Sequence, residues 1–368
     1  MNLPLKILIL FLASVLFFSC EKDVQIKDKV NPPVSHKITI DTLAKNLELP
    51  WGLVYLPNGD LLFTERNGRI NLLHANKIRT TLMHRQVSTN SEGGLLSITI
   101  DPDFKSNHFV YIYESVAGGT NHVMRLVLGD TTLKEDKVIV DQIPYALNHD
   151  GGALKFGPDN YLYIGTGDIT QSPLAQDKNS LAGKILRVDR EGTAAPGNPF
   201  NSRIWSYGHR NVQGFAWTPD GIMLATEHGP SGEFGWCCHD EVNRIQAGNN
   251  YGWPLALAGT ETGTLTPPLL NSGDDTWAPS GCTYLGPNSI WPNCLVVCCL
   301  RGQRLLRIYP DVSGSTVISK SDTLKDQFFR IRNIIEAPDG ALVFCTSNSG
   351  SINPPVMEDD KLYRITIK

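Results

Sequence analysis

Hydrophobic and polar positions along the chain follow a recurring unit, in which a polar turn containing proline precedes a short apolar stretch. The prolines of these turns are Pro57, Pro102, Pro158, Pro219, Pro287 and Pro338. The apolar stretches after them contain the segments LLFTE, FVYIYES, YLYIGTGD, IMLATEHG, CLVVCCL and ALVFCTSN. Proline at the first central position of a turn, with Asp, Asn or Gly after it, closes a hairpin, so each apolar stretch is predicted to be a buried β-strand.

The spacing of these units predicts how they pack. The six prolines lie 45, 56, 61, 68 and 51 residues apart, and a second apolar strand is legible in segments such as RINLLH and KILRVD. A four-stranded sheet cannot bury both faces alone, whereas six such sheets arranged radially cover one another. We therefore predict an all-β fold over residues 38–368, a six-bladed β-propeller with four-stranded blades around a central channel. The alternative, a two-sheet sandwich, does not require a turn repeated at this spacing.

Composition agrees with this fold and excludes one class of partner. The 368 residues include 33 glycines and 23 prolines, and only 19% are charged, which favours tight turns over long surface helices. The formal net charge of -4 provides no broad basic surface, so we expect no nucleic-acid partner.

The first residues predict export. Lys6 precedes an apolar run, interrupted only by Ser14, that is too short to span a bilayer comfortably and is typical of a signal peptide. Ser19-Cys20 resembles a bacterial lipobox, so residues 1–19 are predicted to be removed and Cys20 to be lipidated; plain secretion is the alternative. Residues 20–37 are polar and contain proline, as expected of a tether. The predicted location is periplasmic or outer-membrane-anchored, with the lipid as the only membrane contact.

Seven cysteines follow Cys20, in a compartment that permits disulfides. None has the C-x-x-C spacing of a zinc site, and Cys298 and Cys299 lie in an apolar run, so most are expected to be buried small hydrophobes. Cys237 and Cys238 differ because they lie in a polar, Gly-rich loop. The sequence leaves open whether these two adjacent residues pair with each other.

A first cluster of polar residues surrounds the third turn. Asn148–Gly152 precedes this turn, and Gly165–Asp168 ends the strand after it. Loops at one end of a propeller channel converge, so His149 and Asp168 are placed to meet. An imidazole can take a proton from an alcohol while a carboxylate orients its ring. The alternative is that both residues only cap turns.

A second cluster flanks the fourth turn. Arg210 provides a rigid fork of donors, and Asn211 adds a directional amide, which suits a carboxylate or a quinone oxygen. Carbonyls of Gly229 and Pro230, with carboxylates from Asp240-Glu241 nearby, are hard oxygen ligands that suit Ca²⁺ rather than zinc. Such a loop is also common without a metal.

Arg330 and Arg332 form a third cluster. Side chains two apart in a strand lie on one face, so the two guanidinium groups repel each other unless an anion joins them. The alternative is a pair of solvated surface arginines.

Several longer segments place these clusters in a fixed order. They are PWGLVYLPNGDLLFTER, SEGGLLSITIDPDF, NHDGGALKFGPDNYLYIGTGD, LAGKILRVDREG, YGHRNVQGFAW, DEVNRIQAGNNYGWP and LRGQRLLRI. Together they cover about residues 40 to 366, and NHDGG, GHRNVQG and NNYGWP are the most specific. In this order they resemble the PQQ-dependent soluble aldose sugar dehydrogenases, the glucose/sorbosone dehydrogenase family.

The resemblance implies a quinoprotein enzyme with PQQ and Ca²⁺ as cofactors. His149 matches the general base, which removes the hydroxyl proton as hydride passes from C1 of the sugar to the quinone, and Asp168 matches the acid that orients it. Arg210 and Asn211 match the pair that binds the quinone oxygens, with Arg210 stabilising negative charge there.

The remaining matches concern the cofactors. Gly229 and Pro230 match the turn whose carbonyls hold the PQQ-bound Ca²⁺. The two arginines of the third cluster match those that face the cofactor's carboxylates. Glu92 matches a polar residue against the cofactor, and Trp277 lies close to the position of a cofactor-stacking aromatic.

The chain departs from the family pattern in two places. Where glucose-oxidising members have a lysine near the cofactor, it reads Leu300 or Arg301. The loop Ser231–His239, with its two adjacent cysteines, resembles an insertion after the Gly-Pro turn that reshapes the Ca²⁺ site.

Three functions are compatible with these residues. The leading hypothesis is oxidation of the anomeric hydroxyl of an aldose to the lactone, with an external electron acceptor and a monomeric or homodimeric enzyme. The second is a non-catalytic propeller that binds carbohydrate or a protein partner at the cell envelope. The third is a hydrolase or lyase that uses His149 and a metal without PQQ.

Overall fold

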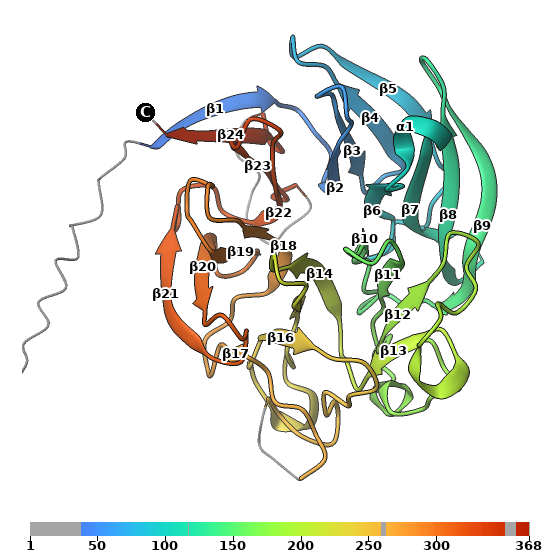
Figure 1. Cartoon of the computed structure of the whole chain (residues 1–368), viewed down its shortest axis with the longest axis vertical. Coiled ribbons are helices and arrows are strands. Elements are labelled where there is room, and N and C mark those ends of the chain that lie inside the picture. Colours follow the sequence, from blue (N-terminus) through green and yellow to red (C-terminus); the bar gives the residue numbers. More distant parts are fainter. Residues whose placement is uncertain (1–37, 117, 259–262, 350–357, 368) are drawn as a thin grey trace, which may run out of the picture. The chain divides into compact units, whose positions relative to one another are not determined.

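The six turn-and-strand units form six antiparallel sheets of four strands each (Figure 1). The computed structural model describes residues 38–116, 118–258, 263–349 and 358–367. The predicted signal peptide, lipidated Cys20 and tether therefore lie outside the described residues.

Five sheets, called blades 1 to 5, each take four consecutive strands from the chain. Blade 1 contains β2 (Pro50–Tyr55), β3 (Leu61–Glu65), β4 (Arg69–Leu73) and β5 (Arg79–His84). Blade 2 contains β6 (Leu95–Ile100), β7 (Phe109–Val116), β8 (Thr120–Leu128) and β9 (Leu133–Pro144). Blade 3 contains β10 (Leu154–Phe156), β11 (Leu162–Gly165), β12 (Lys184–Val188) and β13 (Ile204–Tyr207). Blade 4 contains β14 (Val212–Trp217), β15 (Met223–Glu227), β16 (Glu241–Ile245) and β17 (Leu270–Asn271). Blade 5 contains β18 (Pro279–Leu285), β19 (Cys294–Cys299), β20 (Arg304–Pro310) and β21 (Val317–Thr323).

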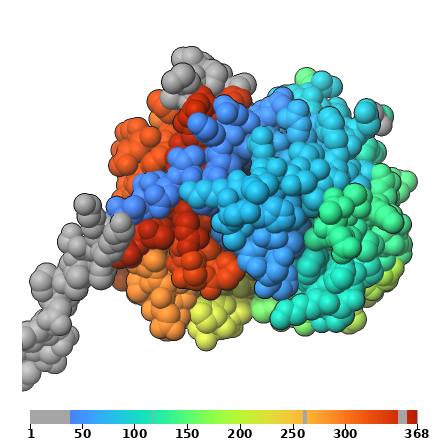
Figure 2. All heavy atoms as spheres, turned by 90° about the horizontal axis from the view of Figure 1, so that it is seen from above, coloured from blue at the N-terminus to red at the C-terminus, as the bar shows by residue number. Residues whose placement is uncertain are grey.

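Blade 6 is assembled from both ends of the described chain. It contains β22 (Ile331–Glu336), β23 (Leu342–Thr346), β24 (Leu362–Ile367) and β1 (Ile38–Ala44). β1 pairs antiparallel with β24, so that Ile38 lies opposite Ile367 and Thr42 opposite Tyr363. In the space-filling view the blue N-terminal residues lie against the red C-terminal ones (Figure 2). Backbone hydrogen bonds therefore join the two ends in one sheet.

Helices are few and short in the part of the chain that the structure describes. They are α1 (Phe104–Asn107) and three 3₁₀ turns, Ser172–Ala175, Pro199–Asn201 and Glu233–Gly235. Among the described residues, no helix has the length and apolar character needed to cross a membrane.

The strand after each proline turn is the second strand of its blade. These strands are β3, β7, β11, β15, β19 and β23. In the first turn, Gly59 N donates to Leu56 O at 2.9 Å and Leu56 N donates to Asp60 O at 2.8 Å, which closes the hairpin between β2 and β3. RINLLH and KILRVD contain the third strands of blades 1 and 3. The predicted six-bladed β-propeller is confirmed.

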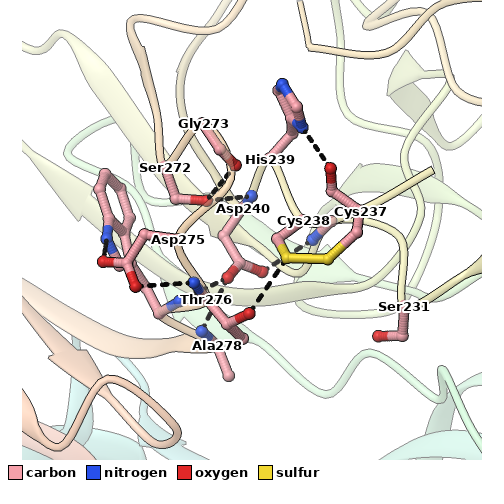
Figure 3. The surroundings of a disulfide bond; sticks show 12 residues. Ser231, Cys237, Cys238, His239, Asp240, Ser272, Gly273, Asp275, Thr276 and Ala278 are labelled. Carbon is pink, nitrogen blue, oxygen red and sulfur yellow. Dashed lines mark hydrogen bonds between the residues drawn. A yellow bond between two sulfur atoms is a disulfide. The ribbon is translucent and has the colours of Figure 1, made fainter.

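The hydrophobic core lies between the blades. Tyr111 and Tyr113 of blade 2, for example, belong to the same buried cluster as Leu162 and Ile164 of blade 3. The five free cysteines of the described region are all buried, as predicted: Cys282, Cys294, Cys298, Cys299 and Cys345. The other two, Cys237 and Cys238, form a disulfide between adjacent residues (Figure 3).

Candidate active site

Antiparallel pairing gathers the candidate residues at one end of the channel. The first strand of each blade is the innermost (Figure 1), and its start lies beside the end of the second strand. The proline turns join the two strands at the opposite end. His149 lies before β10, Asp168 after β11 and Arg210 before β14. These side chains therefore meet at the channel end away from the proline turns, which we call the site end.

His149 and Asp168 are in direct contact. His149 Nδ1 lies 2.7 Å from Asp168 Oδ1, and Trp253 Nε1 donates to Asp168 Oδ2, also at 2.7 Å. All three side chains are buried. Because a carboxylate only accepts hydrogen bonds, the proton of a neutral His149 ring lies on Nδ1, and Nε2 keeps a free lone pair. That lone pair is what a general base needs.

The backbone around His149 is closely packed. His149 has a φ of 63°, in the left-handed region, and its N–H donates to Glu92 Oε2 at 2.8 Å. A Cβ atom at Gly167 would lie 1.8 Å from the carbonyl oxygen of His149. Only glycine allows this approach, which brings the two loops of blade 3 together and Asp168 within reach of the imidazole.

Arg210 and Asn211 connect blade 4 to this pair. Arg210 Nη1 donates to the carbonyl of His228 at 3.2 Å, and Arg210 Nη2 is ion-paired with Glu233. Asn211 Oδ1 accepts a hydrogen bond from Gly151 N at 3.0 Å, while its Nδ2 donates to Glu92 at 3.3 Å. The two side chains are thus held at the site end, next to the loop that carries His149.

Beside them is a pocket with three arginines. Its lining residues are Leu49, Trp51, Arg66, Glu92, Leu96, Gly151, Gln213, His228, Leu300, Arg330, Arg332, Ser347 and Ser349. Glu92 is the only acidic side chain among them. Burial, together with the charges of Arg330 and Arg66, lowers the pKa of Arg332 to about 9.

The same pocket contains polar atoms without partners. The Nε atoms of Arg66 and Arg332 are buried and make no hydrogen bond. Burial, and then the charges of Arg332 and Arg210, lower the pKa of His228 well below its usual range, so this ring is neutral. An excess of desolvated positive charge with free donors fits a ligand that carries several negatively charged acceptor oxygens.

The Gly229-Pro230 turn follows β15. Gly229 N donates to Asp240 Oδ1 at 2.9 Å, and Asp240 Oδ2 accepts from the backbone N–H groups of Trp277 and Ala278 at 2.7 and 2.9 Å. Both carboxylate oxygens of Asp240 therefore already accept hydrogen bonds from backbone N–H groups. Within the described residues, no group of three or more His, Cys, Asp or Glu side chains is arranged around one metal position. A cation at this turn would depend on backbone carbonyls and on the oxygens of a ligand.

Trp277 does not reach the arginine pocket. It packs in the core between blades 4 and 5, and its Nε1 donates to Asp275 Oδ2 at 3.0 Å. Trp51 lines the pocket instead, with the guanidinium carbon of Arg332 5.3 Å from its ring centroid. Where glucose-oxidising family members have a lysine and this chain reads Leu300 or Arg301, Leu300 is the residue that lines the pocket.

Sequence reasoning missed three residues of this site. Arg66, directly after β3 of blade 1, adds a third cation to the pocket. Trp253 holds the second oxygen of Asp168, and Glu233 pairs with Arg210. Arg66 and Trp253 lay within segments that carry the family resemblance, which was the available signal; Glu233 lies in the inserted loop and had none.

Solved structures share this arrangement of blades, and known relatives match the sequence. The PQQ-bound form of an aldose sugar dehydrogenase from Streptomyces coelicolor matches with a TM-score of 0.83 and 34% identity, covering 92% of this chain and all of that one. A putative oxidoreductase (glucose dehydrogenase) from Thermus thermophilus matches with a TM-score of 0.84 and 37% identity, covering 90% of this chain and all of that one. The aldose sugar dehydrogenase YliI of Escherichia coli is 31% identical over 85% of this chain and 91% of its own length.

The fold and these matches define a dehydrogenase of the six-bladed propeller class. The family model described as Glucose / Sorbosone dehydrogenase matches residues 47–353, and the chain belongs to this family. The resemblance predicted from the sequence is confirmed.

Proposed function

We propose that the protein is a PQQ-dependent dehydrogenase that oxidises the anomeric hydroxyl of aldose sugars to lactones. The observation that carries the proposal is the arginine pocket beside the His149–Asp168 pair. Arg66, Arg330 and Arg332 face one acidic side chain, Glu92, and therefore lack the negative charge that a polycarboxylated cofactor brings. Relatives named as PQQ-bound or quinoprotein sugar dehydrogenases support this choice of ligand.

The chain offers several groups that suit this cofactor. The three arginines would hold its carboxylates, and Arg210 with Asn211 would bind its quinone oxygens. The carbonyls of Gly229 and Pro230 would hold a Ca²⁺ ion against it. When bound, PQQ supplies the two-electron acceptor for the hydride on the anomeric carbon, and an external acceptor then takes the electrons.

We assign to His149 the role of general base, which takes the proton of the substrate hydroxyl. Its Nε2 lone pair accepts the hydrogen of the anomeric hydroxyl, and the resulting imidazolium is stabilised by Asp168, which lies 2.7 Å from Nδ1. Arg210, buried at the site end, would stabilise negative charge that develops on a quinone oxygen of the bound cofactor. Trp253 keeps Asp168 oriented, because its indole N–H occupies the second carboxylate oxygen.

The test is reconstitution of the purified protein with PQQ and Ca²⁺, followed by dye reduction with a panel of aldoses. We expect turnover by the wild type and a loss of about 100-fold or more in kcat for His149→Ala, with PQQ binding retained by absorbance titration. Full turnover by His149→Ala would reject the assigned base. A wild type that binds sugar but reduces no dye would instead favour the non-catalytic, carbohydrate-binding propeller.

A further inference from the structure

The loop Ser231–His239 places a carboxylate beside the proposed base. Glu233 Oε1 lies 3.8 Å from His149 Nε2, the nitrogen that Asp168 leaves free, and it is ion-paired with Arg210. A hydroxyl that gives its proton to Nε2 must lie within about 3 Å of that atom. The Glu233 side chain is therefore adjacent to the reacting carbon of any substrate in this position.

Glu233 is charged at neutral pH. Burial alone would raise the pKa of its carboxyl group, but the hydrogen bond and the charge of Arg210 outweigh burial, and the pKa is lowered. An ionised carboxylate only accepts hydrogen bonds. Its neighbour on the substrate must therefore be a donor, such as a hydroxyl or an ammonium group, and a carboxylate or a bare C–H group is disfavoured there.

Aromatic rings continue from Glu233 along the loop. The ring centroid of Phe234 lies 5.4 Å from that of Trp236 and 6.0 Å from that of Trp253, and the rings of Trp236 and Trp253 are 6.2 Å apart. Phe234 remains 63% exposed. An exposed aromatic face beside a charged acceptor is the combination that a pyranose fits, because the sugar has an apolar C–H face and a polar rim.

The loop is held in place from its C-terminal side (Figure 3). The Cys237–Cys238 disulfide is followed by His239, whose N–H donates to Gly273 O at 2.9 Å, and Thr276 Oγ1 contacts Cys238 Sγ at 3.1 Å. Cys238 also packs on the Gly229-Pro230 turn, because a Cβ atom at Gly229 would lie 1.8 Å from the Cys238 carbonyl oxygen. The Glu233 carboxylate is thus presented by a segment that is fixed to the Gly229-Pro230 turn and to the connection after β17.

We propose that Ser231–His239 is the specificity loop of the substrate pocket. Glu233 accepts a hydrogen bond from the substituent on the carbon next to the reacting one, while Phe234 and Trp236 pack against the sugar ring. The class of substrate selected is an aldose with a hydroxyl or an ammonium group at C2. This inference rests on the proposed function. It adds that the inserted loop determines which sugars the pocket accepts.

Three sugars that differ only at C2 test the assignment: glucose, glucosamine and 2-deoxyglucose. With PQQ-loaded wild type, kcat/KM for glucose and glucosamine should exceed that for 2-deoxyglucose by about tenfold or more, the size expected for a hydrogen bond to a charged group. Glu233→Gln should reduce the preference for glucosamine most, because the amide has no charge. Trp236→Ala should raise KM for all three sugars with little change in kcat.

Glu135→Gln is the matched control, because Glu135 is also ion-paired with an arginine, Arg85, but on blade 2. It should leave the preference unchanged. An unchanged C2 preference in Glu233→Gln, with the wild type active, overturns the inference and leaves the proposed function standing. If the wild type oxidises no aldose, sugar binding followed by tryptophan fluorescence decides: weaker glucosamine binding by Glu233→Gln supports the specificity loop, and equal binding overturns it.

Discussion

Each oxygen of the Asp168 carboxylate accepts a hydrogen bond from a different ring. His149 Nδ1 contacts one oxygen, and Trp253 Nε1, from the long connection after β16, contacts the other. The ring of His149 is therefore oriented by a carboxylate that is itself held by a second side chain. In the proposed mechanism Asp168 is a positioning residue, since it would act on the substrate only through His149.

Asp168→Asn should lower kcat by about 100-fold or more while leaving KM nearly unchanged. The amide is the same size but has no charge to stabilise an imidazolium. Steady-state dye reduction with PQQ-loaded enzyme measures the effect, and a melting curve checks that the variant is folded. A reduction in kcat of less than about threefold would show that His149 works without its partner.

Asp150, next to the proposed base, carries a buried charge without full compensation. Its Oδ1 accepts from Asn121 Nδ2 and Ala146 N at 3.1 Å, but Oδ2 has no hydrogen-bond partner. Burial is the main cause that raises the pKa of Asp150 from 3.8 to about 6. The folded state therefore binds a proton more tightly than the unfolded state, and folding loses stability as the pH rises from about 4 to about 6.

Asp150→Asn should remove this fall in folding stability with rising pH. We expect the variant to match the wild type near pH 4 and to be more stable above pH 6, by at most about 3 kcal/mol. Urea denaturation at pH 4 and pH 8 measures both values. A gain of equal size at the two pH values would mean that the charge of Asp150 is not the cause.

Site residues could be predicted from the sequence where an unusual combination of side chains lies near a strand. His149 and Asp168 stand out because an imidazole and a carboxylate lie in loops at the same end of one blade, and the Arg330/Arg332 pair stands out because two guanidinium groups share one face at the start of β22. Arg66 also follows a strand, but a single arginine at such a position is usually exposed to solvent. Its part in the pocket could therefore not be predicted. Trp253 and Trp277 show the limit most clearly: both are aromatic residues in loops, and only the path of the chain brings one of them to Asp168.

At the scale of elements, hydroxyl groups link neighbouring blades near the site end. Thr64, in the second strand of blade 1, donates to Leu96 O in the first strand of blade 2 at 2.5 Å. Thr226, in the second strand of blade 4, donates to Ser280 O in the first strand of blade 5 at 2.6 Å. Gly52 and Gly214 leave room for these bonds, because a Cβ atom at either would lie within 3.0 Å of the accepting carbonyl.

Thr226→Val keeps the shape of the side chain and deletes this cross-blade bond. Because Thr226 and Ser280 are fully buried, we expect a loss of about 1–3 kcal/mol in the free energy of unfolding. Thr226→Ser retains the hydroxyl and serves as the control, with a smaller loss from the missing methyl group. Urea denaturation compares the three proteins; equal losses in both variants would assign the effect to packing instead.

Strands were predictable from sequence in proportion to their burial. The second strands were visible because they are apolar and follow a proline turn. β10 and β17 were not, since they have three and two residues and offer no hydrophobic pattern to detect. β21 is mostly exposed at the outer edge of blade 5, so its composition resembles that of a loop.

At the scale of the whole domain, β1 completes blade 6. It pairs with the outer edge of β24, although the two strands lie at opposite ends of the described sequence. No local signal in the sequence predicts this pairing, because the two strands are separated by the other five blades.

A chain that begins at Asn46 lacks β1 and exposes the edge of β24. We expect its melting temperature to fall by about 5 °C or more relative to a chain that begins at Ile38. We also expect it to associate, since an unpaired strand edge is a template for pairing with another molecule. Differential scanning calorimetry and light scattering test both points, and equal melting temperatures would mean that β1 contributes nothing to closure.

The shared blade also imposes an order on biosynthesis. Blades 1 to 5 each come from one uninterrupted stretch, so each sheet can assemble soon after its residues leave the ribosome. Blade 6 forms later, because β1 is translated before the strands of the other five blades and its partner β24 after them. The nascent chain therefore carries an unpartnered strand until β24 has been made, and the ring closes only after β24 has left the ribosome.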